Sequence, residues 1–350
     1  MADALLRIFD GHNDTLLDLH REERGGGRSF FERGGGHVDL PRAREGNFAG
    51  GFFAAFVPNE DANYERVETD DGHEIPLAGA ISHERAREET YDMLARLYRI
   101  EREAGEAFRV VRTVADLDAC LADGAVAAIP HLEGAAAVAP DLSNLDFLYA
   151  AGVRSIGIVW SRPNAFGHGV QFKYPATPDT GPGLTDAGRE LVRACNERGI
   201  VVDLAHLTAA GFRDAAAVSN DPLVVSHTAA HERCPASRNL TDEQLDAVAD
   251  SGGVVGITFA ASSLRADGRG DPDTPISTLV DHVEYVADRI GVEHVALGSD
   301  FDGATIPESV GDATGLPDVV AALRSRGFDD AAVRKIARDN WLRVVRETWR

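Results

Sequence analysis

The sequence contains very little lysine. Only two of its 35 basic residues are lysines, Lys173 and Lys335, and the other 33 are arginines. Acidic residues outnumber basic ones by 57 to 35, which gives a formal net charge of −22. Nucleic-acid binding depends on positive side chains that displace counterions from phosphates, so this charge disfavours it. Anionic membranes are disfavoured for the same electrostatic reason. We therefore expect neither nucleic acid nor a membrane as a partner.

Cysteine and long apolar runs are also scarce. The three cysteines, Cys120, Cys195 and Cys234, are odd in number and form no C-x-x-C pair. A disulfide framework and a thiolate zinc site are therefore not expected. No apolar run approaches the roughly 18 residues of a transmembrane helix, and the first residues lack the pattern of a secretory signal. These features predict a cytoplasmic protein.

Short apolar runs alternate with longer amphipathic segments along the chain. Eight runs are expected to be strands: Leu5–Phe9, Gly51–Val57, Ala125–Pro130, Arg154–Trp160, Ile200–Leu204, Leu223–Ser226, Val254–Phe259 and His294–Gly298. Helical periodicity is found at His83–Ala104, Thr185–Arg198, Asp242–Asp250, Ile276–Ile290 and Asp330–Thr348. This alternation predicts an α/β fold, a (β/α)8 barrel, with residues 1–350 forming one domain. A doubly wound open sheet is the alternative, but no Gly-rich phosphate-binding turn follows the first run.

Three segments do not fit this alternation. Residues 21–40 carry two Gly triplets, residues 58–80 are polar and acidic, and residues 161–183 are rich in Gly and Pro. Loops of this length within a domain are usually functional or disordered. In a barrel, loops that follow strands lie on the catalytic face, which is where we expect these segments.

Side chains that bind metals gather at the ends of the expected strands. They are His12, Asp14, Glu133, His206 and His227, with Asp300 and Asp302 after the last strand. A lone Asp after a strand is often only a helix N-cap, but five such residues at one end of a barrel predict a metal centre. Imidazole and carboxylate donors without thiolate suit Zn²⁺, with Mn²⁺, Fe²⁺ or Co²⁺ as alternatives. Five side chains suffice for two ions if one carboxylate bridges them.

The motifs that carry these residues resemble those of the membrane (renal) dipeptidase family, within the metal-dependent amidohydrolase superfamily. They are F-D-G-H-N-D, H-L-E-G-A, V-D-L-A-H, V-S-H-T-A-A-H with S-R-N-L-T-D, and G-S-D-F-D-G. The resemblance implies a barrel with His12 and Asp14 on one zinc ion, His206 and His227 on the other, and Glu133 bridging. It also implies that Asp300 is the acid/base and that Arg238 binds the substrate carboxylate. Neither lysine is at a strand end, so a bridging carbamylated lysine is excluded.

One segment departs from the family pattern. Members commonly carry a T-H-x-x-x-N segment after the fourth strand, whose histidine contacts the substrate. Here the segment is V-W-S-R-P-N, so Trp160 replaces that histidine while Asn164 is kept. We expect both residues to bind substrate, with Trp160 as an apolar wall or as a packing residue. His168, in the same loop, is the candidate to replace the missing histidine.

The sequence therefore predicts a metallo-dipeptidase with two Zn²⁺ ions per chain that activate a hydroxide. Its expected substrates are small dipeptides, including those with a D-residue on the C-terminal side, and a homodimer is compatible with the sequence. An amidohydrolase that acts on another small amide or a lactone is the first alternative. The second alternative, from a different class, is a barrel that binds metal or ligand without catalysis.

Overall fold

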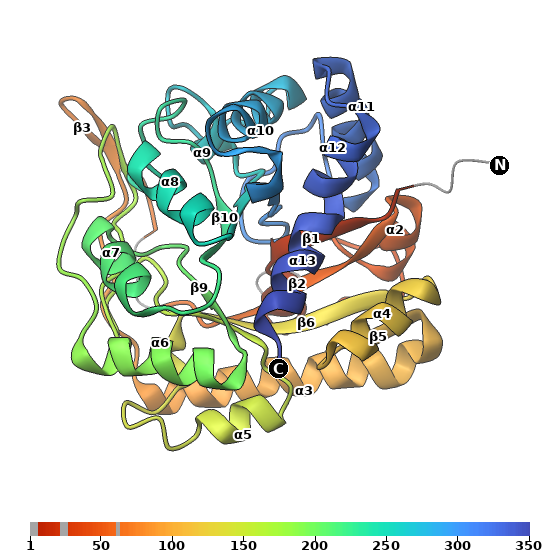
Figure 1. The fold of residues 1–350 in the computed structure, drawn as a ribbon, viewed down its shortest axis with the longest axis horizontal. Helices are drawn as coiled ribbons and strands as arrows, with labels where there is room; N and C mark the ends of the chain where they lie inside the picture. Colours follow the sequence, from red (N-terminus) through yellow and green to blue (C-terminus); the bar gives the residue numbers. More distant parts are fainter. Residues whose placement is uncertain (1–5, 22–26, 61–63) are drawn as a thin grey trace.

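A ring of parallel strands forms the centre of the protein. In this computed structural model, which describes residues 6–21, 27–60 and 64–350, helices surround the strands (Figure 1). The strand order is β1-β2-β6-β7-β9-β10-β11-β12, and all neighbours in this order are parallel. A parallel bridge between Asn13 and Phe301 brings the first and last strands together. The predicted (β/α)8 barrel is confirmed, and the open sheet is not.

The eight predicted strands are present with shifted ends. They span Ile8–Asn13 (β1), Phe48–Phe56 (β2), Val126–Glu133 (β6), Ser155–Gly157 (β7), Val201–Asp203 (β9), Val224–Thr228 (β10), Val254–Ile257 (β11) and Val295–Leu297 (β12). Every residue of these strands is buried. The first strand was predicted too early: Leu5 lies outside the described residues, and β1 continues to Asn13. Because β1, β6 and β10 run further than predicted, His12, Glu133 and His227 lie on strands rather than after them.

Local capping signals fix many of the helix ends. Ser82 accepts a hydrogen bond from Arg85 N at the start of α3 (His83–Ala104), and Thr185 accepts one from Gly188 N at α6 (Asp186–Arg198). Gly199 ends α6 in the left-handed conformation that glycine adopts most readily. The helices α8 (Asp242–Asp250) and α10 (Ile276–Ile290) have the predicted bounds.

The remaining helices were not predicted individually. They are α1 (Thr15–His20), α2 (Leu40–Glu45), α4 (Val114–Ala122), α5 (Leu145–Ala150), α7 (Ala209–Val218), α9 (Ala261–Leu264) and α11 (Leu316–Arg326). Among the described residues, no helix is long and apolar enough to cross a membrane.

The predicted C-terminal helix, Asp330–Thr348, is not continuous. A π-helical turn, Lys335–Asp339, separates α12 (Asp330–Arg334) from α13 (Asn340–Thr348). A π-turn shifts the phase of the residues that follow it, and here Trp341 is fully buried against Phe52, with 5.3 Å between ring centroids. Its Nε1 donates to Leu297 O at 2.8 Å. The helix thereby packs against the barrel strands, which a simple amphipathic pattern did not indicate.

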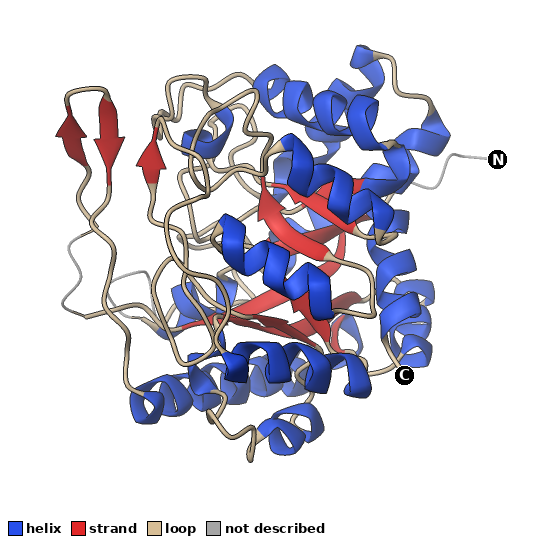
Figure 2. Cartoon of the chain, turned by 60° about the vertical axis from the view of Figure 1, so that its left-hand side comes forward, coloured by secondary structure: helices blue, strands red, loops and turns tan. Residues whose placement is uncertain are grey.

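Two predicted loops contain strands. The hairpin β3 (Val67–Thr69) and β4 (Gly72–Glu74) pairs with β8 (Lys173–Tyr174) in a small antiparallel sheet. Figure 2 shows these three strands standing apart from the barrel. One further strand, β5 (Phe108–Val110), pairs with β6 beside the ring. The sequence pattern missed the small sheet because its pairing joins segments about a hundred residues apart.

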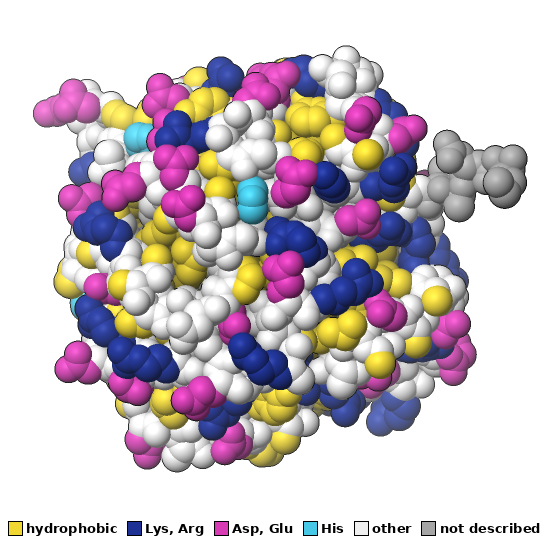
Figure 3. Space-filling view, in the orientation of Figure 1, with side chains coloured by type: hydrophobic (Ala, Val, Ile, Leu, Met, Phe, Trp, Pro, Cys, Tyr) yellow, Lys and Arg dark blue, Asp and Glu magenta, His cyan; other side chains and the backbone are white. Residues whose placement is uncertain are grey.

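Acidic and basic side chains are interspersed on the surface in spite of the net negative charge (Figure 3). Arg289, for example, forms ion pairs with both Asp242 and Asp246. Exposed pairs of this kind contribute little to stability individually. The three cysteines are free and buried, as expected from their spacing.

Candidate metal centre and substrate cavity

A cavity of about 390 Å³ opens at the carboxyl ends of the barrel strands. Seven of the residues predicted from the sequence to bind metal or substrate, or to act as acid/base, line it: Asp14, Glu133, Trp160, His206, His227, Arg238 and Asp300. They come from six different strands or strand ends that are far apart in the sequence. The barrel therefore brings these predicted residues to one place.

Glu133 lies between two pairs of possible ligands. Its Oε2 is 3.8 Å from His12 Nε2, which is itself 3.7 Å from Asp14 Oδ2. Its Oε1 is 2.9 Å from His206 Nε2 and 3.5 Å from His227 Nε2. Each carboxylate oxygen is thus nearest to a different pair, as a bridging carboxylate requires, while the His12 and His227 rings of the two pairs lie 3.9 Å apart.

The surroundings of His12 fit a bound cation. Neither ring nitrogen of His12, nor Asp14 Oδ1, has a hydrogen-bond partner among the described residues, although all three atoms are buried. Burial opposes protonation of His12, but the carboxylates of Glu133 and Asp14 outweigh it and raise the pKa of His12 to about 10. A buried cluster that holds a proton this tightly offers a divalent cation the same electrostatic attraction.

His206 and His227 are held as neutral imidazoles. Burial, together with the nearby positive charges of Arg238 and His12, lowers the pKa of both rings. Ser226 Oγ donates to Asp203 Oδ2 at 2.6 Å and lies 2.8 Å from His227 Nδ1. Since the single hydroxyl proton is on the Asp203 side, Nδ1 of His227 is the donor to Ser226. Its Nε2 then presents a lone pair toward Glu133, which is the form that binds a metal.

Asp300 lies beside the same cluster. A ligand atom of Asp300 is within 4.8 Å of those of His12 and Asp14. Burial, with the negative charge of Asp14 acting in the same direction, raises the pKa of Asp300 to about 7. A Cβ atom at Gly303 would lie 2.1 Å from Asp14 Oδ2 and 2.3 Å from Asp300 Oδ1, so only glycine admits both carboxylates here.

The backbone is unusual at these positions. Asp300, Asp302 and His206 have φ angles of 61°, 66° and 67°, in the left-handed region. Such conformations cost free energy and are often found at functional sites. Asp302 itself is not free to react, because it accepts hydrogen bonds from Thr15 Oγ1 and from the backbone N of His37. We therefore attribute a structural role to Asp302.

Arg238 is buried in the cavity wall. Its Nη2 donates to His227 O at 3.0 Å and its Nε lies 3.0 Å from His206 Nδ1. Ser161 Oγ is 2.8 Å from the same His206 nitrogen. Nη1 of Arg238 makes no hydrogen bond with the residues that the structure describes, so one donor of the guanidinium remains for a ligand.

The segment after β7 differs from its sequence prediction in part. Trp160 lines the cavity, with its ring centroid 5.8 Å from that of His206. Asn164 is not among the lining residues: its Nδ2 donates to Ile158 O, and its Oδ1 accepts from Phe166 N and Gly167 N. His168 is held near Gly183 O, at 3.4 Å, and does not line the cavity. In this loop conformation the side chains of Asn164 and His168 contact atoms of the same segment rather than the cavity.

Several residues of the site were missed by sequence reasoning. Asp203 and Ser226 form a hydrogen-bonded chain with His227, and Phe56, Tyr64 and Phe172 line the cavity beside Trp160. Asp203 and Ser226 carried a detectable signal, since they lie on expected strands within the V-D-L-A-H and V-S-H motifs. The aromatic residues carried none, because they come from two segments, one after β2 and one after β7, that are about a hundred residues apart.

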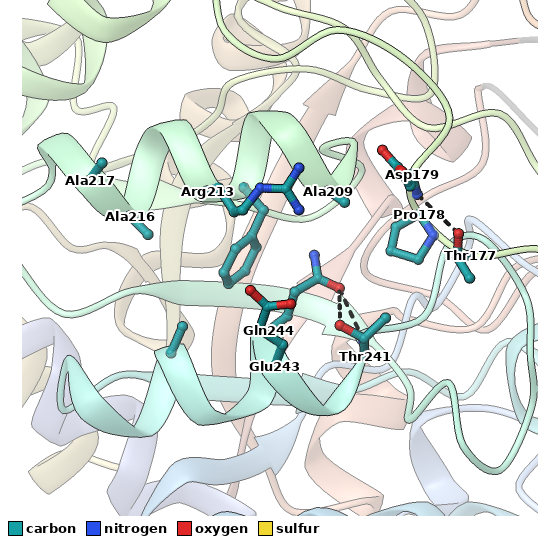
Figure 4. Close-up of a pocket in the computed structure, with 12 residues that line it drawn as sticks. Thr177, Pro178, Asp179, Ala209, Arg213, Ala216, Ala217, Thr241, Glu243 and Gln244 are labelled. Atoms are coloured by element: carbon teal, nitrogen blue, oxygen red, sulfur yellow. Dashed lines mark hydrogen bonds between the residues drawn. The ribbon is translucent and has the colours of Figure 1, made fainter.

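A second cavity, of about 500 Å³, lies on the outside of the barrel between α7 and α8. Figure 4 shows Arg213 from α7 and Glu243 and Gln244 from α8 on its two sides. Its floor contains Phe212 and several alanines, and no histidine is among the described residues that line it. It is larger than the barrel-mouth cavity, but it lacks a set of metal-binding side chains.

Comparison with known proteins agrees with this geometry. Residues 3–349 match the family model of membrane dipeptidase, peptidase family M19. A metallopeptidase from Rhodobacter sphaeroides, solved with a phosphinate mimic of the dipeptide L-Ala-D-Ala, superposes with a TM-score of 0.92. It is 44% identical, and the match covers 98% of this chain and 99% of that one.

Two sequence relatives extend the comparison. A protein of Klebsiella pneumoniae from the pqqA 5′ region is 44% identical over 259 residues, which are 74% of this chain and 96% of the relative. Dipeptidase ataJ of Aspergillus terreus is 28% identical over 362 aligned residues, covering 97% of this chain and 84% of the relative. The chain therefore belongs to the membrane dipeptidase family, peptidase family M19, the family of metallo-dipeptidases that its motifs resemble.

Proposed function

We propose that the chain is a binuclear zinc dipeptidase. The observation that carries this proposal is the position of Glu133, with Oε2 toward His12 and Asp14 and Oε1 toward His206 and His227. A carboxylate whose two oxygens are each nearest to a different ligand pair is what two ions sharing a bridge need. Three histidines and two carboxylates without a thiolate suit Zn²⁺ better than harder cations such as Mg²⁺.

In this proposal His12 and Asp14 hold one ion and His206 and His227 hold the other. When bound, the ions would lower the pKa of water and polarise a carbonyl group. The chain supplies fixed ligand orientations: Ser226 accepts from His227 Nδ1, and Ser161 Oγ is placed 2.8 Å from His206 Nδ1. With its Nδ1 proton directed to Ser226, the His227 ring offers Nε2 to the metal.

Asp300 is the acid/base of the proposed reaction. The raised pKa of Asp300, about 7, suits a group that accepts a proton from water and returns it to the leaving amine near neutral pH. The peptide C–N bond breaks, the water oxygen joins the carbonyl carbon, and the proton from water passes through Asp300 Oδ to the amine. Products are two free amino acids.

Arg238 binds the substrate carboxylate in this proposal. Its free Nη1 and its burial beside the ligands allow a charge-assisted hydrogen bond sheltered from water. The dipeptide mimic bound to the relative from Rhodobacter sphaeroides supports a dipeptide with a D-residue on the C-terminal side as substrate.

A second candidate function is hydrolysis of another small amide or a lactone. Trp160, in place of the histidine that the family commonly has, favours this alternative because it changes the wall beside the scissile carbonyl. The metal centre and Asp300 would serve the same chemistry on such a substrate.

Elemental analysis and a dipeptide screen test the proposal. We expect about two zinc ions per chain and hydrolysis of L,L- or L,D-dipeptides. Glu133→Gln should lose bound metal and activity together, while Glu68→Gln, on the exposed β3, should lose neither. Metal retention near two ions in Glu133→Gln would overturn the bridging assignment. Hydrolysis of lactones or other amides without any dipeptide turnover would favour the second candidate.

A further inference from the structure

Four aromatic residues form one wall of the barrel-mouth cavity. The ring centroid of Trp160 lies 4.9 Å from that of Phe56, 5.8 Å from that of Tyr64 and 5.6 Å from that of Phe172. All four side chains line the cavity. We call Phe56, Tyr64, Trp160 and Phe172 the aromatic wall. Its exposed rings present an apolar surface to whatever enters the cavity.

The strand order places Phe56 and Trp160 of this wall across the barrel mouth from Asp300 and Arg238. Around the ring, β7 and β12 are four positions apart in both directions, and so are β2 and β10. Phe56 ends β2 and Trp160 follows β7. Asp300 follows β12, and Arg238 lies in the segment after β10. Phe56 and Trp160 therefore lie across the ring from Asp300 and Arg238, whereas Phe172 lies near Arg238, because Ser237 Oγ donates to Gln171 O and accepts from Lys173 N.

This arrangement orients a dipeptide, if the proposed function holds. The C-terminal residue contains both the leaving amine and the carboxylate, and these groups are assigned to Asp300 and Arg238. The N-terminal residue lies on the other side of the scissile bond. Its side chain is then directed to the half of the cavity that contains Trp160 and Phe56.

A buried cation lies behind the aromatic wall. The guanidinium carbon of Arg162 is 5.4 Å from the ring centroids of both Phe56 and Trp160. Its Nη2 donates to Val57 O at 2.6 Å and its Nη1 to Asn59 Oδ1 at 2.5 Å. Arg162 is only 3% exposed, and no carboxylate of the described residues forms an ion pair with it. Its positive charge repels a second cation on the other face of the same rings.

We infer that the aromatic wall is the binding pocket for the side chain of the N-terminal residue. The pocket selects dipeptides whose N-terminal side chain is large, apolar and uncharged, and Arg162 behind the wall excludes lysine and arginine side chains. This inference rests on the proposed function for the orientation of the substrate. The preference itself comes from the burial of apolar area against four rings.

A substrate series measures the selection. Leu-D-Ala and Phe-D-Ala should have a kcat/KM about 10- to 100-fold above that of Gly-D-Ala, as expected for burial of a large apolar side chain. Trp160→Ala should reduce this ratio to about threefold or less, with Gly-D-Ala turnover affected least, and Trp160→Phe should restore most of it. Phe147→Ala, at an exposed ring on α5, is the matched control and should keep the ratio of the wild type.

The charge effect has its own comparison. Norleucyl-D-Ala and Lys-D-Ala differ mainly in the terminal ammonium. We expect kcat/KM for the lysyl substrate to be at least about tenfold lower. Arg162→Met should reduce this difference in kcat/KM, while Arg162→Lys, which keeps the charge, should preserve it. Thermal unfolding of each variant shows whether it is folded; if Arg162→Met does not fold, the wild-type comparison of norleucyl and lysyl substrates still decides the point.

Binding of non-hydrolysable phosphinates separates this inference from the proposed function. Calorimetry compares a leucyl and a glycyl phosphinate mimic of X-D-Ala on the metal-loaded protein. Tighter binding of the leucyl compound supports the pocket even if no dipeptide is hydrolysed, a result that would contradict only the proposed function. Equal binding and equal kcat/KM for leucyl and glycyl compounds would overturn the inference while leaving dipeptidase activity intact. Failure to bind either compound would overturn both.

Discussion

Asp203 accepts two hydrogen bonds from Ser226, one from the backbone N at 2.8 Å and one from Oγ at 2.6 Å. Both side chains are buried inside the barrel, and Ser226 Oγ also lies 2.8 Å from His227 Nδ1. This contact fixes the orientation and the protonation of His227, one of the proposed metal ligands. Groups of this kind often affect metal affinity almost as strongly as the ligands do.

Ser226→Ala should therefore weaken metal binding. The variant removes the acceptor for His227 Nδ1, and we expect the affinity for one zinc ion to fall about 10- to 100-fold. Competition with a chromophoric chelator measures this affinity. Ser219→Ala, at a partly buried serine on the outer end of α7, serves as the control. An unchanged affinity in Ser226→Ala would mean that Ser226 only packs within the barrel.

Asp300→Asn should separate catalysis from metal binding. The amide cannot accept the proton from water, so kcat should fall by ~10²–10⁴ while zinc content is kept. Measurement of kcat together with zinc content distinguishes this role from that of a ligand, whose loss would deplete the metal. Asp302→Asn should instead lower the thermal midpoint, because its carboxylate holds Thr15 and the backbone of His37.

Arg238→Ala should affect substrates according to their terminal carboxylate. A sheltered charge-assisted hydrogen bond is worth ~1.5–3 kcal/mol, so kcat/KM for free dipeptides should fall roughly 10- to 150-fold. Dipeptide amides lack the carboxylate and should lose much less. Similar losses on acid and amide would show that Arg238 acts through His206 and His227 rather than on the substrate.

His282 should make the protein less stable in acid. Its Nδ1 accepts from Ala230 N at 3.1 Å, and its Nε2 then donates to Leu264 O at 2.9 Å. Burial lowers the pKa of His282 from 6.5 to about 4. The unfolded chain binds this proton more readily, so stability is complete above the unfolded pKa and is lost as pH falls toward 4.

The contribution of His282 is about 2 kcal/mol between roughly pH 7.5 and pH 5. Urea unfolding of the metal-free wild type and of His282→Gln at both pH values measures it. The variant should be less stable than the wild type at the higher pH, and its stability should fall less on acidification. Parallel losses in the two proteins would assign the acid sensitivity to other groups.

The gathering of the proposed metal ligands at one end of the barrel could be predicted from sequence because the topology of a parallel barrel is regular. Once the apolar runs are assigned to strands, any side chain at their carboxyl ends belongs to one face. His12, Glu133, His206 and His227 follow from this rule, although three of them lie within strands that run longer than predicted. Helix ends such as those of α8 and α10 could also be predicted from sequence, since caps are local signals.

The sequence by itself determined the barrel, the identity of the residues at its mouth and the family to which the chain belongs. Only the tertiary structure decided that Asn164 turns inward to its own loop and that Trp160 meets Phe56 and Tyr64, from a segment about a hundred residues earlier, as well as Phe172 of its own loop. It also decided that Arg162 lies behind those rings, about a hundred residues from its partner Val57. The physical reason is that periodicity and capping depend on neighbours along the chain, whereas the walls of a cavity are set by contacts between segments that no local pattern connects.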